Sequence, residues 1–286
     1  MKKNKLIAPF LKWVGGKRQL MPAINELLPK KYSTYYEPFV GGGAVLFEIQ
    51  PKKAIINDFN SELVNTYNVI KNQTEELIED LKTHVNESEY FYNIRALDRQ
   101  EDFDELSDVK KASRVIYLNK TCYNGLYRVN NSGEFNSPFG KYKNPNIVND
   151  VTIRAVSKYF NANDITIING GFENAVKNIR KGAFVYFDPP YDPVSKSSNF
   201  TGYVQGGFNM FDQVRLRDLC DKLDKQGVKF LVSNSATQLI LDLYSKYNIT
   251  FVKANRAINS DASKRGEVDE VLIRNYEWYK KRHCLE

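Results

Sequence analysis

The sequence predicts an α/β fold with a mostly parallel sheet, a terminal antiparallel strand and one inserted, mainly helical segment. Short apolar runs rich in β-branched and aromatic residues alternate with helical patterns, early in the chain and again after residue 156. Residues 61–156 interrupt this alternation with helical spacing. Glycines or carboxylates follow several apolar runs, which is typical of parallel strands that end at a ligand-binding edge.

The first strand, glycine turn and helix are predicted at residues 35–47. An aromatic strand passes through Gly41, Gly42 and Gly43 into the apolar run 44–47. A strand, a tight glycine turn and a helix start are typical of nucleotide-binding α/β units. No Lys-Ser or Lys-Thr pair follows the glycines, so the segment is not a phosphate loop.

The next strand, residues 54–56, ends at Asn57 and Asp58. An acidic side chain at this point is the usual partner of ribose hydroxyls. The alternative is a helix cap, because a helix is predicted to begin at Asn60 or Ser61. Strand, glycine turn, helix, strand and acid together predict an adenosine-type cofactor.

The N-terminal segment 10–18 combines apolar residues with a glycine pair and a cation. Gly15 and Gly16 let successive backbone amides converge, and Lys17 lies beside them, so a carboxylate or phosphate would fit. Trp13 offers a cover for an apolar or cationic ligand. The alternative is a hydrophobic arm with an ordinary turn.

Asp188, Pro189, Pro190 and Tyr191 follow the apolar run 183–187, which predicts a buried strand. The prolines hold the chain extended, so the Asp188 carboxylate and nearby carbonyls can accept from one amino group. Because the lone pair of an amino group on an aromatic ring is delocalised, such acceptors would favour its pyramidal form and stabilise the positive charge of attack. Tyr191 offers a face to a planar partner. A simple turn after the strand is the alternative.

The segment 119–143 lies within the helical insertion and interleaves Tyr, Asn, Arg and Lys. Asn131-Ser132-Gly133 between two short aromatic runs predicts a β-hairpin. These side-chain types are suited to bases and phosphates, although an ordinary exposed hairpin is the alternative. The predicted domains are residues 1–60 with 157–286, and an inserted recognition subdomain, 61–156.

Alternation resumes after the insertion. A strand is predicted at 165–168, before Gly171 and Phe172, and the remaining elements are a helix at 212–226, a strand at 228–232, a helix at 236–247 and an antiparallel pair at 248–254 and 268–276.

Composition narrows the class of protein. The 286 residues are 42% hydrophobic and 13% aromatic, enough for a substantial core, and the net charge of +7 suits a polyanionic partner. Cys122, Cys220 and Cys284 lack metal-ligand spacing and predict free thiols, with no metal site. His84 and His283 are expected at the surface. Neither a signal peptide nor a transmembrane stretch is evident, so a soluble cytoplasmic protein is expected.

The motifs together resemble the Dam family of DNA adenine-N6 methyltransferases, particularly the DpnII/MboI-type modification enzymes. The resemblance runs over nearly the whole chain. The ordered set that carries it is Phe10 to Lys17, Glu37-Pro38-Phe39-Val40-Gly41-Gly42-Gly43, Asn57-Asp58, Tyr123-Asn124-Gly125-Leu126-Tyr127-Arg128, Pro138-Phe139-Gly140 and Asp188-Pro189-Pro190-Tyr191.

This resemblance implies a Rossmann-like methyltransferase fold, S-adenosylmethionine as cofactor, and duplex GATC as target, with the adenine flipped out of the helix. Asp188 to Tyr191 would form the catalytic segment and hold that adenine. The implied cofactor-binding residues are Trp13, Lys17, Gly41, Gly43, Asp58, Phe172 and Asp188. The implied DNA-binding residues are Tyr123, Asn124, Leu126, Arg128, Pro138 and Tyr142, with Arg128 reading the outer guanine.

One position departs from the family pattern. Close relatives often carry Asp or another polar residue where this chain has Gly171, so stacking by Phe172 is implied without a side-chain hydrogen bond from residue 171. The expected role is the modification half of a restriction-modification system. The endonuclease would share the site without a stable complex, and the chain would act on nucleoid DNA as a monomer or weak dimer. Alternatives are a solitary Dam-type enzyme, an RNA or protein methyltransferase, and an inactive DNA-binding relative.

Overall fold

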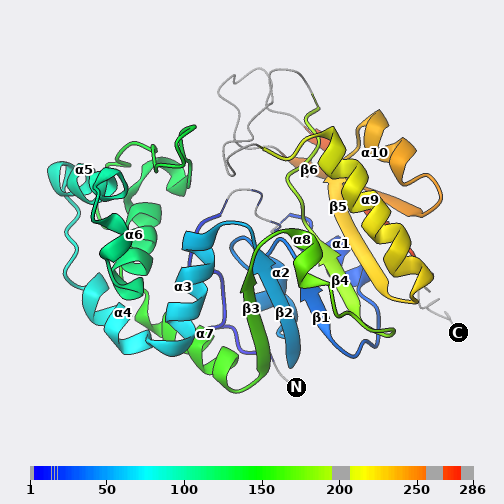
Figure 1. The fold of residues 1–286 in the computed structure, drawn as a ribbon, viewed down its shortest axis with the longest axis horizontal. Coiled ribbons are helices and arrows are strands. Elements are labelled where there is room, and N and C mark those ends of the chain that lie inside the picture. The colour runs from blue at the N-terminus through cyan, green and yellow to red at the C-terminus, as the bar shows by residue number, and fades with distance from the viewer. Residues whose placement is uncertain are drawn as a thin grey trace, which may run out of the picture. The chain divides into compact units, whose positions relative to one another are not determined.

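The computed structural model describes residues 3–13, 15, 17, 19–194, 207–255 and 267–277. Its strands hydrogen-bond in the order β3-β2-β1-β4-β5-β7-β6 (Figure 1). The strands are β1 (Tyr35–Glu37), β2 (Lys53–Asp58), β3 (Asp164–Asn169), β4 (Phe184–Phe187), β5 (Lys229–Ser235), β6 (Asn248–Asn255) and β7 (Glu267–Arg274). β7 runs antiparallel to both β5 and β6, so the predicted α/β class and its reversed terminal strand are confirmed.

Tertiary contacts divide the chain into two compact units. Unit 1 comprises Met1–Arg18, Glu37–Lys177 and Phe200–Phe208. Unit 2 comprises Gln19–Tyr36, Asn178–Asn199 and Asn209–Glu286.

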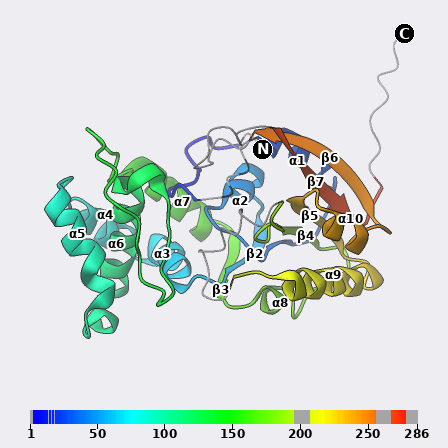
Figure 2. The ribbon, with the colours of Figure 1, turned by 90° about the horizontal axis from the view of Figure 1, so that it is seen from above.

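Unit 1 contains the parallel pair β2 and β3, in register from Lys53 opposite Asp164 to Asp58 opposite Asn169. Its α-helices are α2 (Ala44–Ile49), α3 (Ser61–Asn72), α4 (Thr74–Leu81), α5 (Ser88–Ala96), α6 (Asp108–Thr121), α7 (Asp150–Asn161) and α8 (Phe172–Ala175). α3 and α7 stand between the strand pair and α4, α5 and α6 (Figures 1 and 2). α3 begins where the sequence predicts, because the Asn60 side chain accepts a hydrogen bond from the Leu63 amide at 2.9 Å.

The predicted hairpin follows α6 and the short helix η3 (Tyr123–Gly125). Antiparallel bridges pair Cys122 with Phe139 and Val129 with Phe135. Phe135 and Tyr127 are both buried and pack edge-to-face with their ring centroids 5.5 Å apart. The hairpin therefore has an apolar underside joined to the helical core, with its polar residues left on the outside.

Two further 3₁₀ helices, η1 (Leu97–Arg99) and η2 (Phe103–Glu105), connect α5 to α6. Within the described ranges, no helix combines the length and apolar character needed to cross a membrane.

Unit 2 contains β1, β4 and β5 as parallel neighbours, followed by the antiparallel strands β7 and β6. All four residues of β4 are buried, as the apolar run before Asp188 predicts. α1 (Met21–Leu27) and α9 (Met210–Lys225) lie on opposite faces of these strands (Figure 2). α9 starts with a reciprocal cap between Asn209 and Asp212.

Three helices differ from the sequence prediction. α10 (Gln238–Leu243) is shorter than the predicted 236–247, because Thr237 supplies the N-terminal cap and a turn between Tyr244 and Tyr247 follows the helix. α1 and α8 were not predicted. Both are short, and each is fixed by packing rather than by a long apolar period.

The expectation that His84 lies at the surface is wrong. Its side chain is 7% exposed, and its ring stacks on Tyr117 with 4.4 Å between centroids. Its two ring nitrogens contact the Tyr90 hydroxyl at 2.8 Å and the Ser113 hydroxyl at 2.9 Å. His283 lies outside the described residues.

Burial lowers the pKa of His84 to about 4, outweighing the nearby Asp80 carboxylate, while Lys110 acts in the same direction as burial. The unfolded chain takes up a proton below about pH 6.5 and the folded protein does not. The stability from a neutral His84 is therefore fully present above pH 6.5 and is lost as the pH falls toward 4.

We expect the free energy of unfolding to drop by about 2–3 kcal/mol more in the unsubstituted protein than in His84→Gln between pH 7 and pH 4.5. Urea titrations at both pH values measure this difference. Equal drops in the two proteins would contradict a buried, neutral His84.

The cysteine prediction holds for the residues that the structure describes. Cys122 and Cys220 are free thiols and both are buried. Burial raises the pKa of the Cys122 thiol to about 12 and raises that of Cys220 further. Cys284 lies outside the described residues.

Candidate active site

The glycine turn of unit 1 is shaped by steric limits on both sides. Gly41 and Gly43 have φ values of 49° and 73°, in the left-handed region that favours glycine. A Cβ on Gly41 would lie 2.9 Å from the Trp13 ring, and one on Gly43 would lie 2.7 Å from the Phe47 ring and the Tyr67 hydroxyl. Side chains at these positions would therefore displace the rings that line the turn.

Asp58, at the end of β2, fastens that turn to the start of α3. Its Oδ2 accepts from the Gly41 amide at 2.9 Å, and its Oδ1 accepts from the Asn60 amide at 3.0 Å. Burial raises the pKa of Asp58, although these amides lower it. A carboxylate has about four lone-pair positions, so it can accept from a ligand hydroxyl in addition to these amides. Asn60, not Asp58, is the cap of α3.

Trp13 borders the same turn, and Lys17 lies beside Gly15 in the same N-terminal segment as Trp13. A Cβ on Gly42 would lie 2.9 Å from Trp13 Cβ, and the indole stacks on Tyr127 with 4.9 Å between centroids and 27° between planes. Lys17 is 5% exposed, and its ammonium donates to the Gly15 carbonyl at 2.7 Å. A buried cation beside a glycine turn is suited to an anionic group such as a ligand carboxylate.

Phe172 opens α8 and joins an aromatic cluster. Its ring stacks on Phe39 at 5.4 Å, and Phe208 meets Phe39 edge-on at 5.8 Å. Asn57 holds the neighbouring backbone, because its side-chain amide donates to the carbonyls of Pro38 and Gly170, each at 2.9 Å. The ends of β2 and β3 are thereby tied to the glycine turn.

In unit 2, a buried serine at the end of β5 orients Asp188. Ser233 Oγ donates to Asp188 Oδ1 at 2.8 Å and lies 3.1 Å from the Tyr186 hydroxyl. Because Ser233 has one hydroxyl proton and directs it to Asp188, Tyr186 donates to Ser233. The two hydroxyls thus form a chain that ends on the carboxylate.

The Pro190 carbonyl has a partner within the protein. It accepts from Gln213 Nε2 at 3.0 Å, and Gln213 Oε1 accepts from Asn234 Nδ2 at 3.0 Å. Asn234 Oδ1 in turn accepts from the Asp192 amide at 3.0 Å. Among the described residues the Pro189 carbonyl has no partner, so it is the proline carbonyl left to accept from a ligand.

Tyr191 is fixed at its outer end. Its hydroxyl donates to Glu270 Oε2 on β7 at 3.0 Å. Burial raises the pKa of Tyr191 well above its usual value, with Asp188 as the next cause, so the hydroxyl remains a donor. The side chain cannot swing to another χ1 position without breaking that bond.

We expect Ser233→Ala to lower the catalytic rate about 10-fold, because the Asp188 carboxylate loses its orienting donor. Ser233→Thr keeps the hydroxyl and should restore the rate. An unchanged rate in Ser233→Ala would contradict this role.

The predicted DNA-binding residues lie together around the hairpin. Tyr123 and Tyr142 are 56% and 39% exposed, and Asn124 and Pro138 are also exposed. The Tyr123 amide donates to the Pro138 carbonyl at 2.8 Å. Leu126 is half-buried, with its carbonyl accepting from the Ser137 hydroxyl.

Arg128 is held across the hairpin by a single residue. Its Nε donates to Asn136 Oδ1 at 2.6 Å, and its Nη2 donates to the Asn136 carbonyl at 3.2 Å. Nη1 and one Nη2 hydrogen remain as donors, with no further partner for Arg128 in the described ranges. A guanidinium held in this way keeps a two-donor edge, which matches the O6 and N7 acceptors of guanine.

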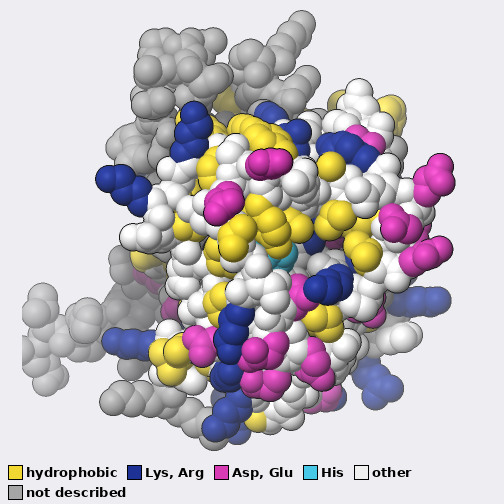
Figure 3. All heavy atoms as spheres, turned by 90° about the vertical axis from the view of Figure 1, so that its left-hand side faces the viewer, with side chains coloured by type: hydrophobic (Ala, Val, Ile, Leu, Met, Phe, Trp, Pro, Cys, Tyr) yellow, Lys and Arg dark blue, Asp and Glu magenta, His cyan; other side chains and the backbone are white. Residues whose placement is uncertain are grey.

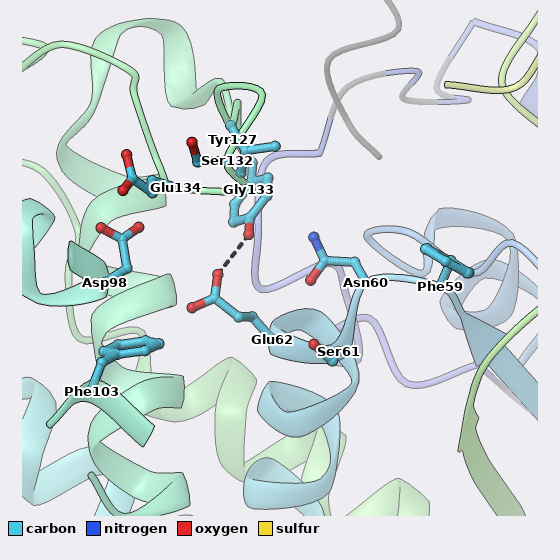
Figure 4. Close-up of a pocket in the computed structure, with 11 residues that line it drawn as sticks. Phe59, Asn60, Ser61, Glu62, Asp98, Phe103, Tyr127, Ser132, Gly133 and Glu134 are labelled. Carbon is cyan, nitrogen blue, oxygen red and sulfur yellow. Dashed lines mark hydrogen bonds between the residues drawn. The ribbon is translucent and has the colours of Figure 1, made fainter. Parts of the chain in front are cut away.

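A cavity of about 290 Å³ lies beneath the hairpin in unit 1 (Figure 4). Its rim includes the turn residues Ser132, Gly133 and Glu134, and its floor includes Glu62 and Asp98 from the helical part. On the face of the molecule in Figure 3, acidic and basic side chains are mixed around apolar ones. The net positive charge therefore does not mark that face as a binding surface for phosphates.

Comparison with known proteins decides the class. The family model of the D12 class of N6 adenine-specific DNA methyltransferases matches residues 13–258. The chain belongs to this family. The resemblance inferred from the motifs and the predicted enzyme class are therefore confirmed.

Full-length relatives agree with the family match. The chain is 48% identical to the type II methyltransferase M1.LlaDCHI of Lactococcus lactis subsp. cremoris, over 96% of this chain and 98% of the relative. It is 43% identical to the type II methyltransferase M.MjaIII of Methanocaldococcus jannaschii, over 94% and 99%. It is 34% identical to the DNA adenine methylase of Escherichia coli K12, over 95% of each chain.

D12-class enzymes use S-adenosylmethionine as methyl donor, and the residues of unit 1 fit this cofactor. The half-buried Asp58 carboxylate is suited to ribose hydroxyls, and the buried Lys17 ammonium to the methionine carboxylate. The reaction of this class is methyl transfer to N6 of adenine in DNA.

Sequence reasoning missed several residues that hold the segment Asp188 to Tyr191 in place. They are Ser233, Asn234, Gln213 and Glu270. The polar ending of β5, Ser233-Asn234-Ser235, was a usable signal, because polar residues that close an apolar strand lie at the ligand-binding edge. Gln213 and Glu270 carry no comparable local signal.

Proposed function

We propose that the chain methylates N6 of adenine within duplex GATC, with the adenine drawn out of the helix, as the modification enzyme of a restriction-modification system. The observation that carries the proposal is the fixed Arg128 guanidinium on a hairpin surrounded by exposed Tyr123, Asn124 and Tyr142. Residues 61–156 then form the target-recognition subdomain, inserted into a catalytic domain made of residues 1–60 and 157–286.

In this proposal the hairpin reads the site directly. Arg128 donates to the outer guanine, while Tyr123 and Leu126 lie at the base pairs and Asn124 meets the backbone. Pro138 and Tyr142 complete the recognition surface. The target adenine must leave the stack, because N6 of a paired base cannot be reached for in-line attack.

The extruded adenine is held by the segment after β4. Asp188 and the Pro189 carbonyl accept from N6, and Tyr191 stacks on the ring. These acceptors favour a pyramidal nitrogen and stabilise its growing positive charge. The Pro189 carbonyl is assigned this role rather than the Pro190 carbonyl, because Gln213 already donates to the latter.

The cofactor residues have separate roles in the same proposal. When bound, S-adenosylmethionine supplies an electrophilic methyl group on sulfur. Asp58 binds the ribose hydroxyls, Lys17 binds the carboxylate, and Phe172 stacks on the adenine moiety. Trp13 covers the turn formed by Gly41 and Gly43, and Asp188 also contacts the cofactor.

The names of the relatives favour a modification enzyme over a solitary methylase. The relatives at 48% and 43% identity are named type II methyltransferases, whereas the relatives named DNA adenine methylase are 34–37% identical. A GATC-cleaving endonuclease is the expected companion, acting on the same site without a stable complex.

The test is transfer of labelled methyl groups to two duplexes that differ only in carrying GATC or a scrambled tetramer. We expect label only in the GATC duplex, at N6. A parallel duplex with 2-aminopurine at the target position should brighten on binding, because the base becomes unstacked. Equal labelling of both duplexes would contradict the proposed target, and unchanged fluorescence would contradict base flipping.

Arg128→Lys is expected to reduce the preference for the correct outer base pair about 10- to 100-fold, because lysine cannot make two parallel hydrogen bonds to guanine. The measurement is kcat/KM on GATC and on a duplex with the outer pair changed. Lys143→Ala removes an exposed charge from the same region, and it should lower both values by a similar factor. Unchanged discrimination in Arg128→Lys would exclude guanine readout by this residue.

A further inference from the structure

Tyr127 lies between two residues assigned to DNA contact, yet it points into the protein. Its side chain is 3% exposed, whereas Leu126 and Arg128 on either side are half-exposed. The ring stacks on Trp13, and the hydroxyl donates to Glu62 Oε2 at 2.6 Å (Figure 4). One hairpin residue therefore reaches two separate segments of unit 1.

Both segments border the turn assigned to the cofactor. Trp13 packs directly on Gly41 and Gly42, so movement of the indole changes the space over the glycine turn. Glu62 lies in the first turn of α3, two residues after Asn60, the residue whose amide donates to Asp58. Tyr127 is thus linked through Trp13 to the glycine turn and through Glu62 to the start of α3 beside Asp58.

The Glu62 end of this link is rigid. Arg114 is 1% exposed, and its Nη1 lies 3.2 Å from Glu62 Oε1 while its Nη2 lies 2.6 Å from Asp98 Oδ2. The Asp98 carboxylate also accepts from the Phe135 amide of the hairpin at 2.7 Å. The Tyr127 hydroxyl is therefore joined through Glu62 to a buried network that also holds the hairpin backbone at Phe135.

A second contact joins the N-terminal arm to the base of the hairpin. Asn119 Oδ1 accepts from the Lys12 amide at 2.9 Å, and Asn119 Nδ2 donates to the Lys12 carbonyl at 2.8 Å. The same Nδ2 donates to the Gly125 carbonyl at 3.1 Å. The arm that carries Trp13 is therefore fixed to the hairpin by its backbone as well as by ring stacking.

We propose that Tyr127 is a positioning residue that couples binding of the target duplex on the hairpin to binding of the cofactor at the glycine turn. This inference rests on the function proposed above. If ordering the hairpin on DNA fixes Tyr127, it also fixes Trp13 and Glu62 in the arrangement that binds the cofactor. Linkage requires the effect to be reciprocal, so the cofactor raises affinity for the target duplex by the same factor.

The experiment measures the Kd of S-adenosylhomocysteine, the unreactive product, with and without saturating GATC duplex. In the unsubstituted protein we expect the duplex to lower this Kd about 5-fold or more. Tyr127→Phe keeps the stack and loses the Glu62 bond, so the factor should fall in part. Tyr127→Leu loses both contacts, and the factor should fall further, to what the remaining Asn119 link between arm and hairpin provides.

Tyr117→Phe is the matched control. Tyr117 is a fully buried tyrosine of the same helical part, and its hydroxyl donates to the Val85 carbonyl at 2.9 Å. Like Tyr127→Phe, this substitution deletes one buried hydroxyl. The coupling factor should nevertheless equal that of the unsubstituted protein. The duplex Kd measured with and without S-adenosylhomocysteine must give the same factor for each protein.

The outcomes separate this inference from the proposed function. Failure of the unsubstituted protein to bind S-adenosylhomocysteine or GATC duplex would contradict the proposed function itself. Binding of both with a factor of one would overturn the coupling alone. The role of Tyr127 would be overturned if both Tyr127→Phe and Tyr127→Leu kept the coupling factor of the unsubstituted protein.

Discussion

Replacing Asp188 with alanine is expected to lower kcat for adenine methylation about 10³-fold while the protein remains folded. The carboxylate is the charged acceptor in the segment after β4, and its position is set by the buried Ser233 hydroxyl at 2.8 Å. Without it, the amino nitrogen keeps its lone pair delocalised and its developing charge is unsupported. Loss of one preorganised hydrogen-bond contact lowers the rate about 10²–10³-fold, and loss of a charged group lowers it more.

Single-turnover methylation of the GATC duplex is the measurement, with urea unfolding as the check on folding. Asp188→Asn retains one acceptor oxygen and should keep more activity than the alanine variant. Asp192→Ala is the matched control, because Asp192 contacts Asn234 through its backbone amide, which the substitution preserves. Retained activity in Asp188→Ala would refute the assigned chemistry.

Replacing Arg114 with methionine is expected to lower the free energy of unfolding by about 3–5 kcal/mol. The guanidinium is 1% exposed and lies between the carboxylates of Glu62 and Asp98. It also donates to the carbonyls of Ile94 and Arg95, at 3.0 and 2.9 Å. Methionine fills the volume but leaves two carboxylates without their shared cation.

Urea titration of the purified proteins measures the change. Arg154→Met is the control, because Arg154 is 43% exposed and forms a surface ion pair with Glu75 at 2.8 Å. A surface pair contributes about 0–1 kcal/mol, so this variant should be close to the unsubstituted protein. Similar losses in the two variants would show that the buried network is not the source of the effect.

The short-range features of the fold could be predicted from the sequence. The fully buried β4, the Asn60 cap of α3 and the reversed strand near the C-terminus each follow from a local pattern. The boundaries of α10 and the short α1 and α8 did not follow, because single turns are stabilised by packing rather than by periodicity. His84 was misplaced for the same reason, since its burial depends on Tyr117 and Ser113.

By itself, the sequence predicted the motif residues of the candidate site, because the roles proposed for them depend on the type of residue at a strand end or turn. Gly41, Asp58 and Asp188 were identified in this way. Only the tertiary structure decided what holds them. Ser233 lies 45 residues from Asp188 along the chain, Glu270 lies 79 from Tyr191, and Tyr127 lies 65 from Glu62. Hydrogen bonds between such distant residues leave no local pattern, because their spacing is set by how strands and helices pack.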